Sequence, residues 1–257
     1  MSRLSSLPAA LRRALDQRRA LKVIAGLTNF DAVSVQRIAR AASAGGADLL
    51  DIACDPALVH AVHAVAPDLA VCVSAVDPEL FPAAMAAGAV VAEIGNFDAF
   101  YAQGRTFSAE EVLDLTRRTR ELLPDVVLSV TVPHKLPLDQ QESLALQLAE
   151  AGADLIQTEG GTSAIPHSPG VLGLIEKAAP TLAAAHAISR ALAGAERPLP
   201  VLCASGLSSA TVPMALAAGA AAVGVGSAVN RLQDELAMVA VVRGLREAIG
   251  TTAAVRI

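Results

Sequence analysis

The sequence predicts a closed (β/α)8 TIM barrel with one extra helix at its N-terminus. Three observations predict this fold class. The chain has 257 residues, close to the roughly 250 that are typical of such barrels. Eight short apolar runs alternate with helical stretches along the whole chain. Four of the turns that lead from a helix into the next run contain the pair Gly-Ala.

The eight apolar runs are rich in β-branched residues and are bounded by Gly, Pro or Asp, as expected of buried strands. They lie at residues 20–27, 47–53, 70–75, 90–95, 126–132, 155–159, 200–205 and 222–227. Strands that alternate strictly with helices form a parallel sheet with right-handed crossovers. Eight such units favour a closed barrel, and a doubly wound open sheet is the alternative.

The helical stretches carry local signals at both ends. We expect helices near 33–44, 56–65, 78–87, 108–122, 138–151, 172–193, 209–218 and 232–248. Asp31 can cap the first of them, and Ser108 with Glu111 forms a capping box. Asp77-Pro78 places a proline at a first helical position. At the other end, glycine in the Gly-Ala pairs can adopt the left-handed conformation that ends a helix.

The segment before the first strand, residues 1–19, predicts an additional helix. Leu7, Leu11, Ala14 and Leu15 share one helical face, which we expect to cover the N-terminal floor of the barrel. Residues 20–250 then form the barrel, and residues 1–257 form a single domain. An amphipathic transit peptide is the alternative, although Asp16 and the direct continuation into a strand disfavour it.

Composition excludes several classes of function. The net charge is −5, aromatic residues make up 2%, and there is no tryptophan, which disfavours a nucleic-acid-binding surface. No apolar run of membrane-spanning length lacks breakers, so no membrane association is expected. The three cysteines fit neither a metal-binding spacing nor a disulfide framework, which indicates a reducing compartment. No metal site is predicted.

The last two strands end in glycines that suit a phosphate group. Active sites of such barrels lie at the carboxyl ends of the strands, often with a phosphate at strands seven and eight. Glycine lets backbone N–H groups approach an anion, and a short helix starting at Ser227 would direct its positive end towards it. The predicted binding residues are Ser205, Gly206, Leu207, Gly224, Gly226 and Ser227. Alternatively, the glycines only relieve crowding in tight loops.

A second binding segment is the long loop 159–170, in which Gly160 and Gly161 precede two hydroxyl residues. Long loops of this kind are often lids or binding loops, and a Gly-Gly-Thr-Ser run can form an anion nest. His167 in the same loop is predicted to be a surface histidine. We therefore expect Gly160 and Gly161 to complete the phosphate site.

Four ionisable residues within the predicted strands form the candidate catalytic set. Alternation directs Asp51 and Glu93 into the barrel, places Lys22 in its middle, and places Glu159 at the end of strand six. They could form an acid/base cluster, or Lys22 could supply an amine for a Schiff base with a carbonyl substrate. The alternative is an ion network that fills the barrel, because buried charges must be paired.

Other rim residues offer weaker candidates. Cys54 is a minor candidate for a nucleophile, because no histidine is evidently paired with it. His134 and Lys135 suit an anionic ligand or a solvated loop. Asn29 and Asn96 each begin the repeated tetrapeptide Asn-Phe-Asp-Ala, and serve either as turn caps or as ligand contacts.

Three segments resemble a known family. Residues 22–31, 46–56 and 203–207 look like the hypothetical chloroplast reading frame twenty-three family of cyanobacteria and algal plastids. The resemblance runs from about Leu21 to about Gly244 and implies a cyanobacterial-type cytoplasm or a plastid stroma. It carries over no reaction and no catalytic residues. The pattern at strands seven and eight is more loosely similar to ribulose-phosphate-binding barrels, thiazole synthase and flavin-dependent nitronate monooxygenases.

Three functions remain at this point. The first is an enzyme that acts on a small phosphorylated metabolite as an isomerase, epimerase or lyase. The second is an oxidoreductase that holds the phosphate of FMN in the same site; no other cofactor is implied. The third is a non-catalytic barrel that senses a phosphorylated metabolite. Assembly into a homo-oligomer is compatible with all three.

Overall fold

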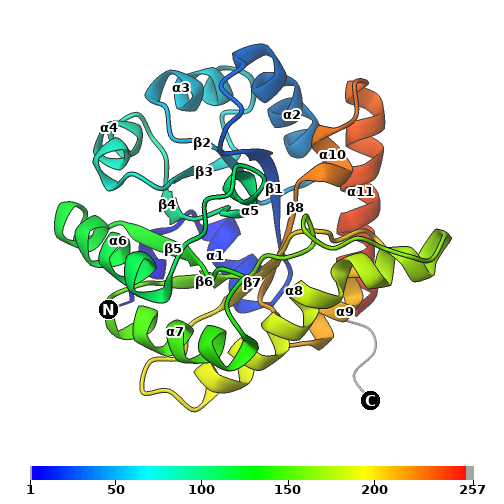
Figure 1. The fold of residues 1–257 in the computed structure, drawn as a ribbon. Coiled ribbons are helices and arrows are strands. Elements are labelled where there is room, and N and C mark those ends of the chain that lie inside the picture. The colour runs from blue at the N-terminus through cyan, green and yellow to red at the C-terminus, as the bar shows by residue number, and fades with distance from the viewer. Residues whose placement is uncertain (1, 253–257) are drawn as a thin grey trace.

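The computed structural model describes residues 2–252 and shows a closed barrel of eight parallel strands in the order β1 to β8. Helices surround the strands (Figure 1). The strands are β1 (Ala20–Gly26), β2 (Leu49–Ala53), β3 (Ala70–Ala75), β4 (Val91–Ile94), β5 (Val127–Thr131), β6 (Leu155–Gln157), β7 (Val201–Ala204) and β8 (Ala222–Val225). The predicted barrel is confirmed, and the open-sheet alternative is wrong, because β1 also pairs with β8.

The helices follow the predicted stretches with local differences. They are α1 (Ala9–Asp16), α2 (Ala32–Gly45), α3 (Pro56–Val65), α4 (Phe81–Ala86), α5 (Asp98–Tyr101), α6 (Ala109–Leu122), α7 (Leu138–Glu150), α8 (Gly170–Ala193), α9 (Val212–Ala217), α10 (Ser227–Asn230) and α11 (Glu235–Thr252). Two short 3-10 helices, η1 (Arg3–Ser6) and η2 (Pro78–Leu80), complete them. The stretch expected at 78–87 is therefore split in two. Helix α5 was not predicted, whereas α10 begins at the expected residue.

The predicted helix ends are largely confirmed. The side chains of Asp31 and Ser108 accept hydrogen bonds from backbone N–H groups in the first turns of α2 and α6, and Asp55 does the same for α3. Glu111 does not reach back to complete a capping box, because it pairs with Arg105 instead. The glycines of all four Gly-Ala turns have positive φ, which explains their use at these helix ends.

The extra helix lies where the sequence placed it, across the N-terminal end of the barrel. Leu7, Leu11 and Leu15 are buried, and they pack against an apolar layer formed by the first residues of the strands. That layer includes Leu49 and Leu155. The floor of the barrel is thus closed by hydrophobic packing, so the open end is the carboxyl-terminal rim. Residues 1 and 253–257 of the predicted single domain lie outside the described residues.

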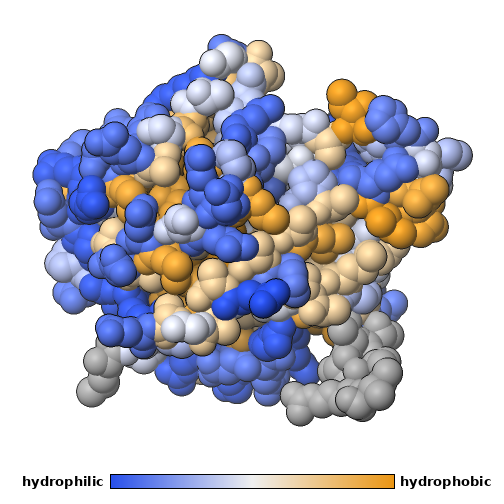
Figure 2. Space-filling view, turned by 60° about the horizontal axis from the view of Figure 1, so that its bottom comes forward, coloured by the Kyte–Doolittle hydropathy of each residue, from blue (hydrophilic) through white to orange (hydrophobic). Residues whose placement is uncertain are grey.

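Helix α8 is long and apolar enough, by length and composition alone, to cross a membrane. Within the barrel it contacts α7 and β7, and Ala184, Ile188 and Leu192 on its inner face are buried. These contacts are those of a barrel helix with one apolar side. Its first turns leave Val171 and Leu172 exposed. Figure 2 shows hydrophobic groups at the right-hand edge of the molecule, the side on which the start of α8 projects in Figure 1.

Candidate functional site

The barrel interior holds a polar layer above its apolar floor, built around Lys22. The ammonium group of Lys22 lies 2.8 Å from Glu93 Oε2 and 3.4 Å from Asp51 Oδ2. All three side chains are at most 1% exposed. Ser74 donates to Asp51, and Ser129 donates to Glu93 at 2.7 Å. The strands therefore bring together three of the four predicted catalytic residues as a buried ion network.

Two amides join this polar layer to the rim. Asn96 Nδ2 lies 3.0 Å from Asp51 Oδ2 and 3.2 Å from Glu93 Oε1. Gln157 Nε2 donates to Glu93 Oε1 at 2.7 Å and contacts Asn96 Oδ1 at 3.2 Å. The carboxylates are thus surrounded by donors, which is what burial of charge requires.

This arrangement opposes the Schiff-base interpretation of Lys22. Burial alone would lower the pKa of Lys22, but the charges of Asp51 and Glu93 raise it above its usual value. An amine that attacks a carbonyl must be deprotonated, whereas this one is held protonated between two carboxylates. The geometry therefore favours the ion-network alternative for Lys22, Asp51 and Glu93.

A pocket of about 260 Å³ opens above the polar layer at the carboxyl-terminal rim. Its walls come from the loops after β1, β4, β6, β7 and β8. The lining residues include Ile24, Gly26, Leu27, Thr28, Asn96, Asp98, Thr158, Glu159, Thr162, Ala204, Ser205, Gly206, Gly226, Ser227, Asn230 and Arg231. Of the predicted catalytic residues, Glu159 lines this pocket, whereas Lys22, Asp51 and Glu93 lie beneath it.

One wall of the pocket, from the β7 and β8 loops, has the features of an anion site. Ser205 and Gly206 are consecutive residues with positive φ, 76° and 75°. Among residues 2–252, the backbone N–H groups of Gly206 and Gly226 donate to no protein acceptor. Ser227 opens the short helix α10, in which the N–H groups of Val229 and Asn230 donate to Gly226 O, so that within the helix only the N–H groups of Ser227 and Ala228 are left without an acceptor. Arg231 adds a cationic side chain to the same pocket. We call these residues the glycine wall.

The other predicted binding residues lie behind the glycine wall and do not line the pocket. Leu207 is 4% exposed and belongs to the hydrophobic core. A Cβ at Gly224 would meet side chains of Ala204 and Leu202 at 2.8 and 3.0 Å. Gly160 has a φ of +126° and faces Pro180 and His134. The structure thus gives these three residues packing contacts and places them outside the pocket lining.

Gly161 is required by a close approach between two loops. A Cβ there would lie 2.4 Å from the carbonyl oxygen of Ser205 and 2.5 Å from the Cα of Gly206. The loop after β6 thus packs backbone to backbone against the loop after β7. Gly226 differs, because a Cβ there would meet its nearest neighbours at 3.6 Å, an ordinary contact. Gly161 therefore shapes the rim, and Gly226 leaves space in the pocket.

We expect Gly161→Ala to destabilise the chain by about 1–3 kcal/mol, the usual cost of forcing atoms into a filled space. Chemical denaturation measures the change. Gly244→Ala is the matched control, because no atom lies within 4 Å of a Cβ at Gly244. Equal stability of the two variants would contradict the close approach of the loops.

Asp98 and Glu159 line a second part of the pocket, and together with His134 they form a group that we call the acidic cluster. His134 Nδ1 lies 3.3 Å from Glu159 Oε1 and 3.5 Å from Asp98 Oδ1. Glu159 is 3% exposed, and the side chains of Asp98 and His134 are each 12% exposed. Asp98 lies in the short helix α5, and His134 follows β5. The cluster thus combines three segments that are far apart in the sequence.

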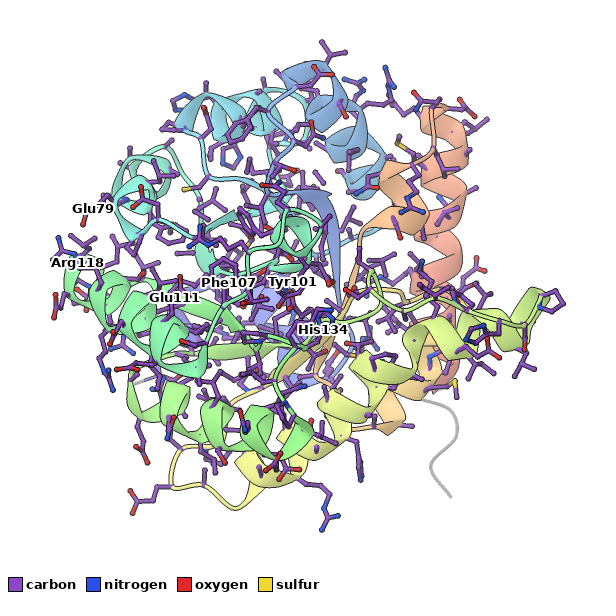
Figure 3. The ribbon with its side chains drawn as sticks, viewed as in Figure 1. Glu79, Tyr101, Phe107, Glu111, Arg118 and His134 are labelled. Atoms are coloured by element: carbon purple, nitrogen blue, oxygen red, sulfur yellow. The ribbon has the colours of Figure 1, made fainter. Side chains whose placement is uncertain are left out.

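Several donors fix Glu159 in this cluster. The backbone N–H groups of Asp98 and His134 donate to its two oxygens at 3.1 and 3.2 Å, and the hydroxyl of Tyr101 donates to Oε1. Figure 3 shows Tyr101 and His134 together over the middle of the barrel, with ring centroids 4.9 Å apart. Burial raises the pKa of Glu159, while its bonds with His134 and Tyr101 oppose that rise.

The glycine wall and the acidic cluster are joined through Ser205. Its hydroxyl donates to Asp98 Oδ2 at 2.8 Å and accepts from the N–H of Thr162 at 2.9 Å. Ser163 also contacts Asp98, at 3.3 Å. A ligand at the glycine wall would therefore lie next to groups that also position the acidic cluster.

The remaining rim candidates divide between structure and site. Burial, followed by the charges of Asp55 and Asp77, raises the pKa of Cys54 to about 12, which disfavours a thiolate nucleophile. Asn29 bonds with Ser34 and the N–H of Asp31, as a local turn cap. Asn96 instead reaches into the polar layer, as described above.

Sequence reasoning did not identify Asp98, Tyr101 or Arg231 as site residues, and it included Thr162 only as part of the Gly-Gly-Thr-Ser run. Asp98 was visible as the third residue of the second Asn-Phe-Asp-Ala tetrapeptide, but it was read only as part of a turn. His134 was weighed as a contact for an anionic ligand; it lies beside two carboxylates.

Comparison with known proteins gives a family and a fold. A family model described as "Protein of unknown function (DUF561)" matches residues 7–255. An "uncharacterized protein ycf23" from Cyanophora paradoxa is 43% identical over 225 residues, covering 88% of this chain and 90% of the relative. This match agrees with the resemblance noted from the sequence and with a plastid or cyanobacterial origin.

Solved structures with the same fold include enzymes of phosphorylated compounds. A putative deoxyribose-phosphate aldolase from Toxoplasma gondii has a TM-score of 0.61 and 18% identity, covering 93% of this chain and 95% of its own. A 3-hexulose-6-phosphate synthase has a TM-score of 0.60 and 16% identity, with coverages of 89% and 99%. Likeness at this identity establishes the barrel fold alone.

Proposed function

The chain belongs to the DUF561 family of proteins of unknown function, and we propose that it is an enzyme acting on a small phosphorylated metabolite. In this proposal the glycine wall holds the phosphate group, and the acidic cluster acts on the other end of the substrate. The reaction class is that of an isomerase, epimerase or lyase, which moves a proton to or from carbon.

One observation carries the proposal: unpaired backbone donors and a carboxylate cluster line the same small pocket. The N–H groups of Gly206 and Gly226, together with the start of α10 and Arg231, favour an anion. Glu159 and Asp98 line the pocket as well. A ligand that carries a phosphate and a reactive carbon a few atoms away matches both the glycine wall and the acidic cluster. The two similar enzymes named above also act on sugar phosphates according to their names.

Proton transfer in this proposal falls to the acidic cluster. A carboxylate of Asp98 or Glu159 accepts a proton from a substrate carbon next to a carbonyl group, and returns it to a neighbouring carbon or oxygen. Asp98 remains partly exposed towards the pocket, whereas Glu159 is fixed by four donors. Lys22 has no part in this step, because it lies beneath the pocket in the ion network.

The FMN alternative has less support. The pocket volume of about 260 Å³ is below the roughly 300–1,000 Å³ typical of sites for drug-sized ligands. No aromatic side chain is among the pocket-lining residues within the described part of the chain, so no ring is available to stack on an isoalloxazine. A substrate of the size of a triose or pentose phosphate fits the volume better.

Thermal and chemical denaturation with ligands test the phosphate site. We expect inorganic phosphate and sugar phosphates to stabilise the chain and the matching unphosphorylated sugars to leave it unchanged. A ligand at 100 times its Kd adds about 2.7 kcal/mol to the free energy of unfolding. Stabilisation by FMN alone would favour the flavin alternative, and no response to any phosphate would refute the proposed site.

Exchange of substrate C–H protons with D₂O, followed by NMR, separates an enzyme from a metabolite sensor. Carbonyl-containing sugar phosphates that bind are the substrates to screen. Exchange that Asp98→Asn abolishes while phosphate binding persists would support the enzyme. Binding without exchange across the whole panel would favour the sensing alternative. The proposed compartment is a cyanobacterial-type cytoplasm or a plastid stroma, and a homo-oligomer is compatible with the proposal.

A further inference from the structure

We propose that Asp98, His134 and Glu159 form a binding site for one divalent metal ion. The use of this ion in catalysis rests on the proposed function, whereas its binding does not. The ion would be held through His134 Nδ1 and one oxygen of each carboxylate.

The charge balance of the buried carboxylates is the first argument. Four carboxylate side chains among residues 2–252 are buried: Asp51, Glu93, Asp154 and Glu159. Asp51 and Glu93 share Lys22. Asp154 pairs with three arginines, at positions 3, 120 and 197.

Glu159 alone in that set has no lysine or arginine within ion-pair distance, and its charged neighbour Asp98 has the same sign. A buried charge without a counter-charge is strongly unfavourable. Among residues 2–252, His134 is the one residue recorded in an ion pair with either carboxylate, and their other hydrogen-bond donors are neutral. A divalent cation would supply the missing positive charge.

The spacing of the three ligand atoms is the second argument. His134 Nδ1 is 3.3 Å from Glu159 Oε1 and 3.5 Å from Asp98 Oδ1, and all three atoms lie within 4.8 Å of one another. Nitrogen and oxygen atoms bound at about 2.1 Å to one ion are about 3.0–3.5 Å apart in octahedral or tetrahedral geometry. Two of the three distances in the cluster therefore match those around a common ion, and the third is at most 4.8 Å.

The surrounding groups already orient these ligands. Ser205 holds Asp98 through Oδ2, and the N–H of Asp98 holds Glu159 through Oε2. Oδ1 and Oε1, the oxygens nearest His134, would face the ion, and they would share it with the neutral donors they already accept from: Ser163 for Oδ1, and Tyr101 and the His134 N–H for Oε1. Outer contacts of this kind fix the ligands of metal sites. Tyr101, which donates to Glu159 Oε1, acts here as a positioning residue.

The ligand types select the class of ion. One imidazole with two carboxylates suits Mn²⁺, Fe²⁺, Co²⁺ or Zn²⁺ better than Ca²⁺, which prefers oxygen ligands alone. Three protein ligands leave coordination positions open on the pocket side, as in catalytic metal sites. Within the proposed function, the ion would polarise the substrate oxygen that becomes negative when carbon loses its proton.

Cobalt binding to the full chain, stripped of metals with a chelator and kept free of phosphate, tests the site. We expect one Co²⁺ per chain, seen as visible absorption bands and displaced by Zn²⁺ in calorimetry. His134→Ala and Asp98→Asn should each weaken binding by about 100-fold or more, and Tyr101→Phe by about 10-fold, within the range for lost outer contacts. His186→Ala should leave binding unchanged, because that exposed histidine lies on α8 in a different hollow.

Absence of stoichiometric Co²⁺ binding would overturn the inference. Co²⁺ binding that persists in both His134→Ala and Asp98→Asn would also overturn it, and so would loss of binding in His186→Ala. Melting curves show whether each variant is folded. If His134→Ala unfolds, the test of metal binding uses Asp98→Asn, because Asp98 is partly exposed. The phosphate titrations are made on the metal-free chain. Cobalt binding without a phosphate response would therefore support the metal site and refute the proposed function. A phosphate response without cobalt binding would support the proposed function and refute the metal site.

Discussion

Replacement of Lys22 by methionine is expected to destabilise the chain by about 3–5 kcal/mol, the usual cost of leaving buried charges without their partner. Methionine retains much of the lysine stem but removes the ammonium group that contacts both Glu93 and Asp51. Two carboxylates would then face each other in the closed interior. Since domains are stable by only about 5–15 kcal/mol, this loss is a large fraction of the total stability. Urea denaturation gives the difference directly.

A compensating variant distinguishes a structural from a catalytic role of this lysine. Neutralising both partners as well, with Asp51→Asn and Glu93→Gln, should recover much of the loss, because no charge is then buried alone. Arg118→Ala, which breaks an exposed ion pair with Glu79, is the control and should change little. A Lys22→Met chain as stable as the original would contradict the ion network and would revive the amine as a catalytic group.

Gly226→Asp is expected to weaken phosphate binding by about 100-fold or more. The new carboxylate would stand in the open space beside the glycine wall, where like charges about 5 Å apart repel by about 3 kcal/mol at an effective dielectric constant near 20. That energy corresponds to slightly more than two orders of magnitude in Kd. Calorimetric titration with phosphate measures it.

Two controls separate this charge effect from other causes. Gly226→Ala should fold normally, because the added methyl group meets its neighbours at 3.6 Å and the φ of −107° suits any residue. Gly244→Asp changes the net charge equally on the outer helix α11. If Gly226→Asp and Gly244→Asp lower the affinity for phosphate to the same extent, the phosphate does not bind beside Gly226.

The fold was predictable because each of its elements has a local cause. The strand runs and the glycine-marked helix ends are visible one unit at a time, and eight repetitions leave little choice of architecture. The site was only partly predictable. Lys22, Asp51 and Glu93 were expected inside the barrel, and they lie there. The sequence could not decide between an ion network and a catalytic set, because that depends on the distances between side chains on different strands.

The two Asn-Phe-Asp-Ala tetrapeptides show why local reasoning reached its limit. Asn29 caps its own turn, whereas Asn96 has a φ of +60° and turns its amide into the polar layer. The second copy also begins the short helix α5, which carries Asp98 over the barrel mouth. Identical neighbours in sequence thus have different neighbours in space, and the acidic cluster arises from that difference.

The separation between the polar layer and the rim pocket has a consequence for how this chain can change over generations. The charges whose loss is expected to destabilise the barrel lie beneath the pocket, and most residues that would meet a ligand lie on loops above them. A mutation in those loops can alter what is bound while leaving the stability of the scaffold nearly intact. New specificity is therefore accessible through single substitutions at pocket positions that have room for a side chain, such as Gly226, and not at tightly packed ones such as Gly161.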